Sequence, residues 1–291
     1  MVEFIVVQTL NGIVYSMLLF TVSLGLSMIF GLMGLVNLAH GSFFLLGAYI
    51  GLTVWRLTGN FWIAFFIAPV ASGLIGIILE KVWFTRFYQR THMDHVLLTL
   101  GFSYVFSDIV KFFWGVEIQA LSKPALLEGS IRIVGTQFPI YRLFVIGAGI
   151  SLFLLMRLFL GRTNLGALVR AAVLDRDMVI GLGFNVRAIF TVMFAVGVFL
   201  AGLGGILAAP ITGVYIGLDL DILIIALIVV TVGGLGNINS AFWASLLIGI
   251  ADTFGKTLLP NFSLFLIFTI MAVVLIIRSM GRPDVEEEEM H

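Results

Sequence analysis

Two short glycine-containing segments carry polar side chains that can form hydrogen bonds without a fixed charge. The six candidates are Asn37, His40 and Ser42 in residues 31–42, and Asn237, Asn239 and Ser240 in residues 234–240. Each segment lies between long apolar runs, so it interrupts helical sequence where lipid is expected. Irregular backbone at that depth is tolerated only where protein or a water-filled cavity satisfies its N–H and C=O groups. These side chains are therefore predicted to line a path on which a polar solute makes weak, passing contacts.

A structural interpretation stays open for each of them. Asn and Ser also cap helices, and a single histidine near a break is often a buried imidazole with its own partners. The two segments match each other at an offset of 200 residues, since Gly-Leu-Val-Asn at 34–37 corresponds to Gly-Leu-Gly-Asn at 234–237. Paired interruptions indicate the solute path of a transporter, although four matching positions can also arise by chance.

The composition favours a membrane protein around these segments. The chain has 291 residues, 60% hydrophobic and 11% charged, which is too apolar for one water-soluble core. Apolar runs near the ~20 residues that cross a bilayer predict an all-α polytopic membrane protein with about nine membrane-crossing segments and broken helices near Gly34 and Gly234. The predicted spans are residues 5–30, 42–57, 61–84, 96–116, 141–160, 188–210, 216–234, 237–256 and 262–279.

The overall charge and the absence of cysteine exclude several classes of function. The formal net charge is zero, so no basic field indicates nucleic acid as a partner. The chain has no cysteine, which excludes disulfides, thiolate metal sites and a cysteine nucleophile. Paired carboxylates, Ser with Lys and metal-ligand clusters are not assembled either, so we expect no enzyme, no cofactor and no metal. Residues 249–257 resemble a phosphate-binding loop only superficially, because the spacing is wrong and a membrane span holds them.

The distribution of Lys and Arg predicts the orientation. No basic residue precedes Arg56, whereas the connections between spans near residues 81–90 and 157–187 are rich in Lys and Arg and are therefore expected in the cytoplasm. With nine spans, the N-terminus lies outside and the C-terminus, which carries Arg278 and Arg282, lies inside. Residues 1–283 are expected to form a single transmembrane domain, and residues 284–291 a disordered acidic tail.

Two pairs of charges within predicted spans require an explanation. Asp108 with Lys111 and Asp252 with Lys256 are spaced so that each pair can neutralise itself on one helix face, and a proton relay is the alternative. Asp219 and Asp221 are expected at the outer end of their span, where they could also receive an external protein. The small residues at 202–206 are expected to permit close helix packing.

Residues 161–187 are far more polar than their surroundings and predict a folded cytoplasmic loop. Thr163 or Asn164 can cap a helix whose apolar positions fall at helical spacing, and residues 175–177 then turn the chain before a second short piece. A surface helix with charges at its end suits docking into a groove of a partner. The alternative is an inert amphipathic connector.

Three motifs in order resemble the permease subunits of branched-chain amino-acid ABC importers. They are Gly-Leu-Met-Gly-Leu-Val-Asn-Leu-Ala-His-Gly-Ser, Arg-Ala-Ala-x-x-Asp-Arg-Asp-Met-x-x-x-Leu-Gly-Phe-Asn and Val-Gly-Gly-Leu-Gly-Asn-Ile-Asn-Ser-Ala, and the likeness covers residues 8–280. The resemblance implies a subunit in the bacterial or archaeal cytoplasmic (inner) membrane, paired with a second related permease. Two cytoplasmic ATPases and an extracytoplasmic solute-binding protein would complete the importer.

The resemblance also places a coupling helix that contacts the ATPase at residues 165–183. The candidate contact residues are Arg170, Asp175, Arg176, Asp177 and Gly181. The Glu-Ala-Ala motif of other importers is not met, because Arg170 precedes Ala171 and Ala172. The rival hypothesis is an ion-coupled secondary carrier or channel that acts without an ATPase, with Asp108 or Asp252 as its ion site.

Overall fold

The computed structural model describes residues 1–87 and 90–280, and the expected tail at 284–291 lies outside these residues. The helices are α1 (Val2–Met33), α2 (His40–Thr58), α3 (Phe61–Val82), α4 (His92–Trp114), α5 (Ile140–Arg162), α6 (Asn164–Leu174), α7 (Arg176–Gly181), α8 (Val186–Thr212), α9 (Leu218–Gly233), α10 (Ile238–Leu258) and α11 (Ser263–Met280). Short 3-10 turns occupy Phe84–Arg86, Ala125–Leu127 and Pro260–Phe262. The strands β1 (Ser130–Ile133) and β2 (Thr136–Pro139) form one antiparallel hairpin. The expected helical fold is therefore right apart from this hairpin.

Six helical segments of the described chain are long and apolar enough to cross a membrane. They are Val2–Met33, Phe61–Arg86, His92–Trp114, Ile140–Arg162, Val186–Thr212 and Pro260–Met280. The other three predicted spans correspond to α2, α9 and α10, which are helices but do not belong to this set, so the count of nine is not confirmed. The 16 residues of α9 reach about 24 Å, less than the hydrocarbon thickness. The helices α2 and α10 begin at the breaks and therefore have polar first turns.

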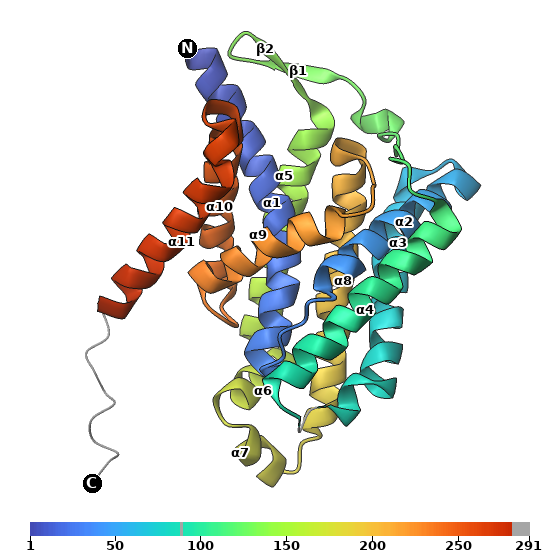
Figure 1. The fold of residues 1–291 in the computed structure, drawn as a ribbon, viewed down its shortest axis with the longest axis vertical. Coiled ribbons are helices and arrows are strands. Elements are labelled where there is room, and N and C mark those ends of the chain that lie inside the picture. Colours follow the sequence, from blue (N-terminus) through green and yellow to red (C-terminus); the bar gives the residue numbers. More distant parts are fainter. Residues whose placement is uncertain (88–89, 281–291) are drawn as a thin grey trace.

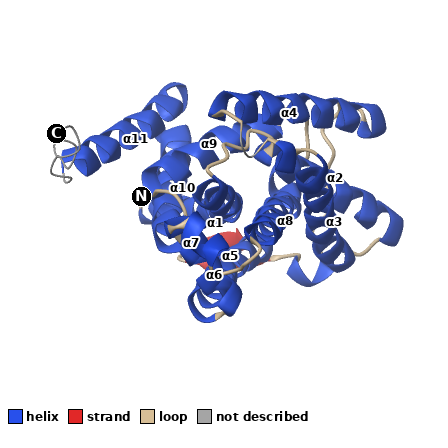
Figure 2. Cartoon of the chain, turned by 90° about the horizontal axis from the view of Figure 1, so that it is seen from below, coloured by secondary structure: helices blue, strands red, loops and turns tan. Residues whose placement is uncertain are grey.

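Helix α1 lies at the centre of the bundle. Figure 2 shows it surrounded by α5, α8, α9 and α10, with α11 on one flank. Of the most apolar stretch of α1, 83% is buried, against 11% for α11. The outer helices thus expose apolar faces, as expected for surfaces that meet lipid or another subunit.

Small residues let α2 and α8 approach each other closely, which confirms the role expected for residues 202–206. A Cβ atom on Gly47 would lie 2.3 Å from the Cα of Gly202, and one on Gly205 would lie 2.1 Å from the carbonyl oxygen of Phe44. Neither position has room for a side chain. This contact holds α2, which follows the first break, against the central helices.

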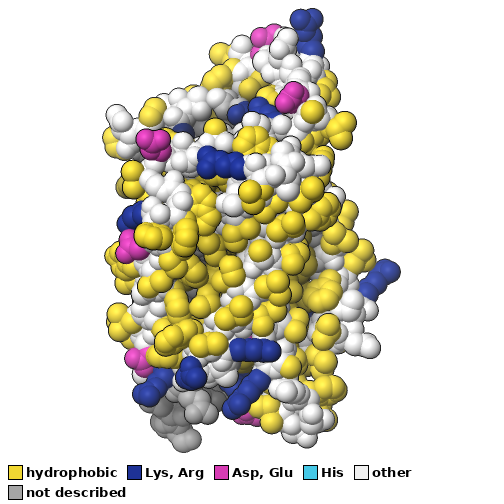
Figure 3. Space-filling model, turned by 90° about the vertical axis from the view of Figure 1, so that its right-hand side faces the viewer, with side chains coloured by type: hydrophobic (Ala, Val, Ile, Leu, Met, Phe, Trp, Pro, Cys, Tyr) yellow, Lys and Arg dark blue, Asp and Glu magenta, His cyan; other side chains and the backbone are white. Residues whose placement is uncertain are grey.

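The two ends of the bundle differ in content. The N-terminus and β1–β2 lie at one end, called the hairpin end, and α6 and α7 lie at the opposite end, called the α6–α7 end (Figure 1). Hydrophobic side chains cover the middle of the face in Figure 3, and most charged side chains lie toward its two ends. This distribution is typical of a protein that spans a bilayer.

Candidate translocation site

The first break, residues 34–39, is held by hydrogen bonds from the protein. Gly34 ends α1 in the left-handed conformation (φ 63°), and the chain then runs without helix to His40. Leu38 N–H donates to Thr99 Oγ1 (3.2 Å), Thr99 Oγ1 donates to Val36 O (3.4 Å), and Ser103 Oγ donates to Leu38 O (3.1 Å). Two hydroxyls of α4 thus satisfy backbone groups that lipid could not.

The three candidates of this break are buried and have protein partners. A ring nitrogen of His40 lies 3.0 Å from Val22 O, and Ser42 Oγ donates to Asp219 Oδ2 (3.2 Å). Asn37 Oδ1 accepts a hydrogen bond from Ala39 N–H (3.1 Å). These contacts fix the first turn of α2 against α1 and α9, and contact with a solute requires a rearrangement. Their place in a solute path stays a prediction.

The second break, residues 234–237, packs against the end of α1. Gly234 and Gly236 both have positive φ angles, 84° and 72°. Gly236 N–H donates to Ser27 Oγ (2.9 Å), and a Cβ on Gly31 would lie 2.8 Å from Gly236. The two breaks therefore adjoin through the last turns of α1.

The structure does not bring the six candidates together around one cavity. Asn237 caps α10 by accepting from Ser240 N–H (3.2 Å), and both Asn237 and Asn239 are exposed. Ser240 lines a surface groove with Trp243 and Arg278. Their function in transport stays a prediction as well.

Sequence reasoning missed a polar pocket at the hairpin end. It has a volume of about 290 Å³ and lies among α1, α5, α8 and α10. Its lining consists of Gln8, Asn11, Val14, Tyr15, Leu18, Arg142, Ile211, Thr212, Asp252, Thr253, Lys256 and Thr257. A second pocket of about 430 Å³ shares four of these residues, Tyr15, Leu18, Thr212 and Lys256, and extends toward α9. The two pockets therefore adjoin each other.

One sequence signal could have found this pocket. Gln8, Asn11 and Tyr15 recur at helical spacing within an otherwise apolar span, so they lie on one face of α1. Polar side chains on one face of a membrane helix indicate a cavity or a polar partner.

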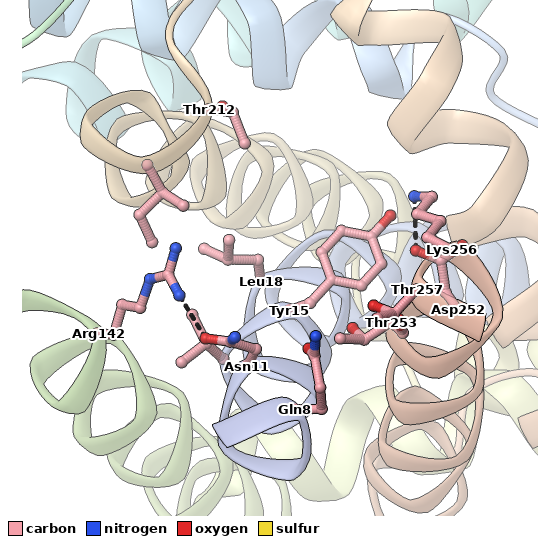
Figure 4. A pocket seen from close by; sticks show the side chains of 12 residues that line it. Gln8, Asn11, Tyr15, Leu18, Arg142, Thr212, Asp252, Thr253, Lys256 and Thr257 are labelled. Atoms are coloured by element: carbon pink, nitrogen blue, oxygen red, sulfur yellow. Dashed lines mark hydrogen bonds and ion pairs between the residues drawn. The ribbon is translucent and has the colours of Figure 1, made fainter. Parts of the chain in front are cut away.

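Charged groups face this pocket from two sides (Figure 4). Lys256 Nζ lies 2.6 Å from Asp252 Oδ2 and 5.2 Å from the centre of the Tyr15 ring. On the other side of Tyr15, the guanidinium of Arg142 donates to Asn11 Oδ1. The predicted pairing of Asp252 with Lys256 is confirmed, as is that of Asp108 with Lys111 (3.0 Å).

The acidic residues of α9 differ in environment. Asp219 is buried and accepts from Ser42, whereas Asp221 faces the larger pocket and accepts from the hydroxyl of Tyr215 (3.2 Å). Partial burial and the Asp221 carboxylate both raise the pKa of Tyr215. Tyr215 therefore stays protonated near neutral pH and remains a hydrogen-bond donor at the mouth of this pocket.

The segment 161–187 folds as expected into two short helices. Thr163 caps α6 by accepting from Gly166 N–H (3.0 Å), and Asp175 ends α6 and caps α7 through Met178 N–H (2.8 Å). All five candidate contact residues are exposed: Arg170, Asp175, Arg176, Asp177 and Gly181. Leu174 and Met178 are also exposed, by 87% and 62%, so apolar side chains are presented beside the charges.

A hydrophobic cluster connects α6 and α7 to the broken helices. Val169 and Ala172 of α6 and Val179 of α7 belong to one buried cluster with Leu32, at the end of α1, and Ile238, at the start of α10. The buried faces of α6 and α7 thus pack into the same cluster as the helix ends that flank both breaks.

The structure offers no metal centre among the residues that it describes: groups of three or more His, Asp or Glu side chains that could hold an ion are not found there.

Comparison with known proteins identifies relatives over almost the whole chain. A permease protein of a high-affinity branched-chain amino acid transport system, BraD of Pseudomonas aeruginosa, is 24% identical over 299 residues, which cover 96% of this chain and 97% of the relative. LivH of Escherichia coli K12, a permease protein described in the same terms, is 24% identical over 306 residues and covers 96% of each chain. A probable branched-chain amino acid transport permease of Methanocaldococcus jannaschii is 22% identical over 254 residues, 84% of this chain and 78% of the relative. These relatives are transport permeases rather than enzymes.

No solved structure matches the chain significantly. The profile of a protein family described as "Branched-chain amino acid transport system / permease component" matches residues 8–275. This match confirms the resemblance that the three motifs indicated. The chain therefore belongs to the family of permease components of branched-chain amino acid transport systems.

Proposed function

We propose that this chain is a membrane-spanning subunit of an ATP-driven importer and forms half of the path for branched-chain or related small amino acids. A second related permease would supply the other half, two cytoplasmic ATPases the energy, and an extracytoplasmic binding protein the solute. Membership of the family supports the assignment. The names of the relatives support the class of solute.

The observation that carries this proposal is the cluster beneath α6 and α7. The segment exposes charged and apolar side chains on one side, and its buried side chains belong to the cluster that also contains Leu32 of α1 and Ile238 of α10. Binding and hydrolysis of ATP in a docked ATPase would move this segment, and the cluster would pass the movement to α1 and α10. The two permeases would then alternate between outward and inward states.

The same geometry supports a proposed orientation in the membrane. If α6 and α7 contact a cytoplasmic ATPase, the hairpin end and the N-terminus lie outside, in agreement with the Lys and Arg in the connections at the α6–α7 end. The polar pocket then opens to the side from which a binding protein delivers its solute. The six candidates at the breaks, Asn37, His40, Ser42, Asn237, Asn239 and Ser240, would lie deeper and contact the solute once the breaks rearrange.

The carrier hypothesis would require an ion site at Asp108 or Asp252. The side chain of Asp108 is 76% exposed, and both carboxylates are paired with a lysine on their own helix. These pairings favour self-neutralisation over ion coupling.

Exchange of Asp175, Arg176 and Asp177 for Ala tests the proposal. We expect the assembled importer in proteoliposomes to keep hydrolysing ATP but to lose most amino-acid uptake, because the contact that transmits movement is removed. A matched control replaces Asp108 and Lys111, an ion pair outside this segment, with Ala and should leave both activities unchanged. If the triple variant transports at the normal rate per ATP, the docking role of this segment is wrong.

A further inference from the structure

The polar pocket at the hairpin end contains one cation that is not paired with any carboxylate of residues 1–87 and 90–280. Its lining includes two cations, Arg142 and Lys256, and one carboxylate, Asp252. Asp252 is 2% exposed and pairs with Lys256 through Oδ2, whereas its Oδ1 has no hydrogen-bond partner among the described residues. The Arg142 guanidinium donates to the neutral amide of Asn11 and takes part in neither of the two ion pairs of the described residues.

Partial burial of the Arg142 guanidinium without a counter-ion costs free energy, and a bound anion would offset that cost. Arg142 also lies in the first turn of α5, where the unsatisfied N–H groups of the helix add positive potential. A basic residue is unfavourable for the helix itself at that position. Both features favour an anion beside Arg142.

The remaining walls define the rest of the ligand. Val14 and Leu18 of α1 and Ile211 of α8 supply an apolar surface beside the guanidinium. A volume of about 290 Å³ lies at the lower limit of small-molecule pockets, so it suits a ligand smaller than a drug molecule. Together with the adjoining pocket, which adds Asp221, the lining carries two cations and two carboxylates, and this balance suits a solute without net charge.

We propose that this pocket binds a free amino acid with an aliphatic side chain, and that Arg142, held by Asn11, recognises its carboxylate. The inference rests on the proposed function and deepens it, because it assigns to the permease a solute site of its own. A guanidinium binds a carboxylate through two parallel hydrogen bonds, which distinguishes an acid from its amide.

The test measures ligand binding to the purified full-length chain in detergent. The probes are L-leucine, L-leucinamide, which lacks the carboxylate, and inorganic phosphate, which lacks the apolar group. Native chain should bind leucine about 10- to 100-fold more tightly than leucinamide, the range expected for hydrogen bonds to a charged group. Phosphate should compete weakly.

Two variants remove the unpaired positive charge of Arg142 in different ways. Arg142→Gln deletes it, and Asn11→Asp retains the arginine but supplies a carboxylate partner within the protein. Both should bind leucine and leucinamide with nearly equal affinity, whereas a purely structural role of Arg142 would weaken both ligands alike. Arg132→Gln, the same exchange at an exposed position of β1, is the matched control and should keep the preference for leucine.

The inference is overturned if Arg142→Gln and Asn11→Asp retain the preference for leucine over leucinamide. It is also overturned if phosphate binds the native chain as tightly as leucine does. Uptake by the complete importer separates this result from the proposed function. ATP-driven uptake with an unchanged KM in Arg142→Gln would reject the pocket and leave the function standing. Leucine binding that depends on Arg142, without any ATP-driven uptake by the complete importer, would support the pocket and reject the proposed function.

Discussion

At the scale of single residues, the hydroxyls of α4 explain how an irregular segment exists inside the bundle. Thr99 Oγ1 accepts from Leu38 N–H, and its single hydroxyl proton is within reach of either Val36 O or His95 O of its own helix. Ser103 Oγ donates to Leu38 O. Without them, buried backbone groups of the first break would lack partners. The break is therefore a specified structure rather than a loose connection.

Exchange of Thr99 for Val should lower stability by about 1–3 kcal/mol, because the shape is kept while Leu38 N–H is left unsatisfied. Unfolding in detergent measures the loss, and amide exchange at Leu38 should accelerate. Thr269→Val, an exposed threonine that bonds only to Phe265 O, is the control and should change stability little. Equal effects of the two exchanges would show that Thr99 does not support the break.

Residue pairs close in sequence were predictable, whereas distant pairs were not. Asp108 with Lys111 and Asp252 with Lys256 follow from helical spacing alone. The contacts of Ser42 with Asp219 and of Arg142 with Asn11 join residues 177 and 131 positions apart, and only the packing of whole helices determines them. For this reason the polar pocket escaped sequence reasoning.

At the scale of elements, breaks and glycine contacts determine how the helices meet. The glycine and asparagine pattern predicted both interruptions. Thr163 was one of the two residues expected to cap α6, and Asp175, which was expected in the turn that follows, also caps α7. The sequence did not reveal that the second break packs onto the end of α1, since that contact depends on Gly31 and Gly236 approaching each other. Three of the nine predicted spans correspond to α2, α9 and α10, which do not belong to the six long apolar helices, so the count of nine stays a prediction.

Exchange of Gly205 for Ala should destabilise the bundle, since the new methyl group would overlap the carbonyl of Phe44 and force α2 away from α8. Gly101→Ala in α4 is the matched control, because a Cβ at Gly101 would contact no neighbouring atom within 4 Å. It should be neutral or stabilising by about 0.5–1 kcal/mol, the helix preference of alanine over glycine. Thermal unfolding measures the stability of both variants. A Gly205→Ala variant as stable as Gly101→Ala would contradict the close contact between α2 and α8.

At the scale of the whole molecule, the proposed solute pocket lies at one end of the helix bundle and the proposed ATPase contact at the other. The bundle connects them through α1, which lines the pocket at Tyr15 and adjoins the first break at Leu32. Family membership alone does not specify this arrangement. It follows from the residues of α1 that line the pocket, adjoin the first break and belong to the cluster.

The orientation can be measured without background because the chain has no cysteine. Ser130→Cys in the hairpin should react with a membrane-impermeant thiol reagent added to intact cells, and Leu174→Cys in α6 only after the cells are opened. Both side chains are exposed, so access and not burial decides the result. If Leu174→Cys reacts in intact cells and Ser130→Cys does not, the proposed orientation is wrong.

The central claim is that a motor outside this chain drives solute through it. The most direct measurement is uptake of radiolabelled leucine into proteoliposomes that contain the chain with its partner subunits and binding protein, energised either by ATP or by a sodium or proton gradient. The account predicts uptake with ATP, its loss without the ATPases, and no uptake from either gradient with this chain alone. Gradient-driven accumulation by the chain alone, independent of ATP, would contradict it.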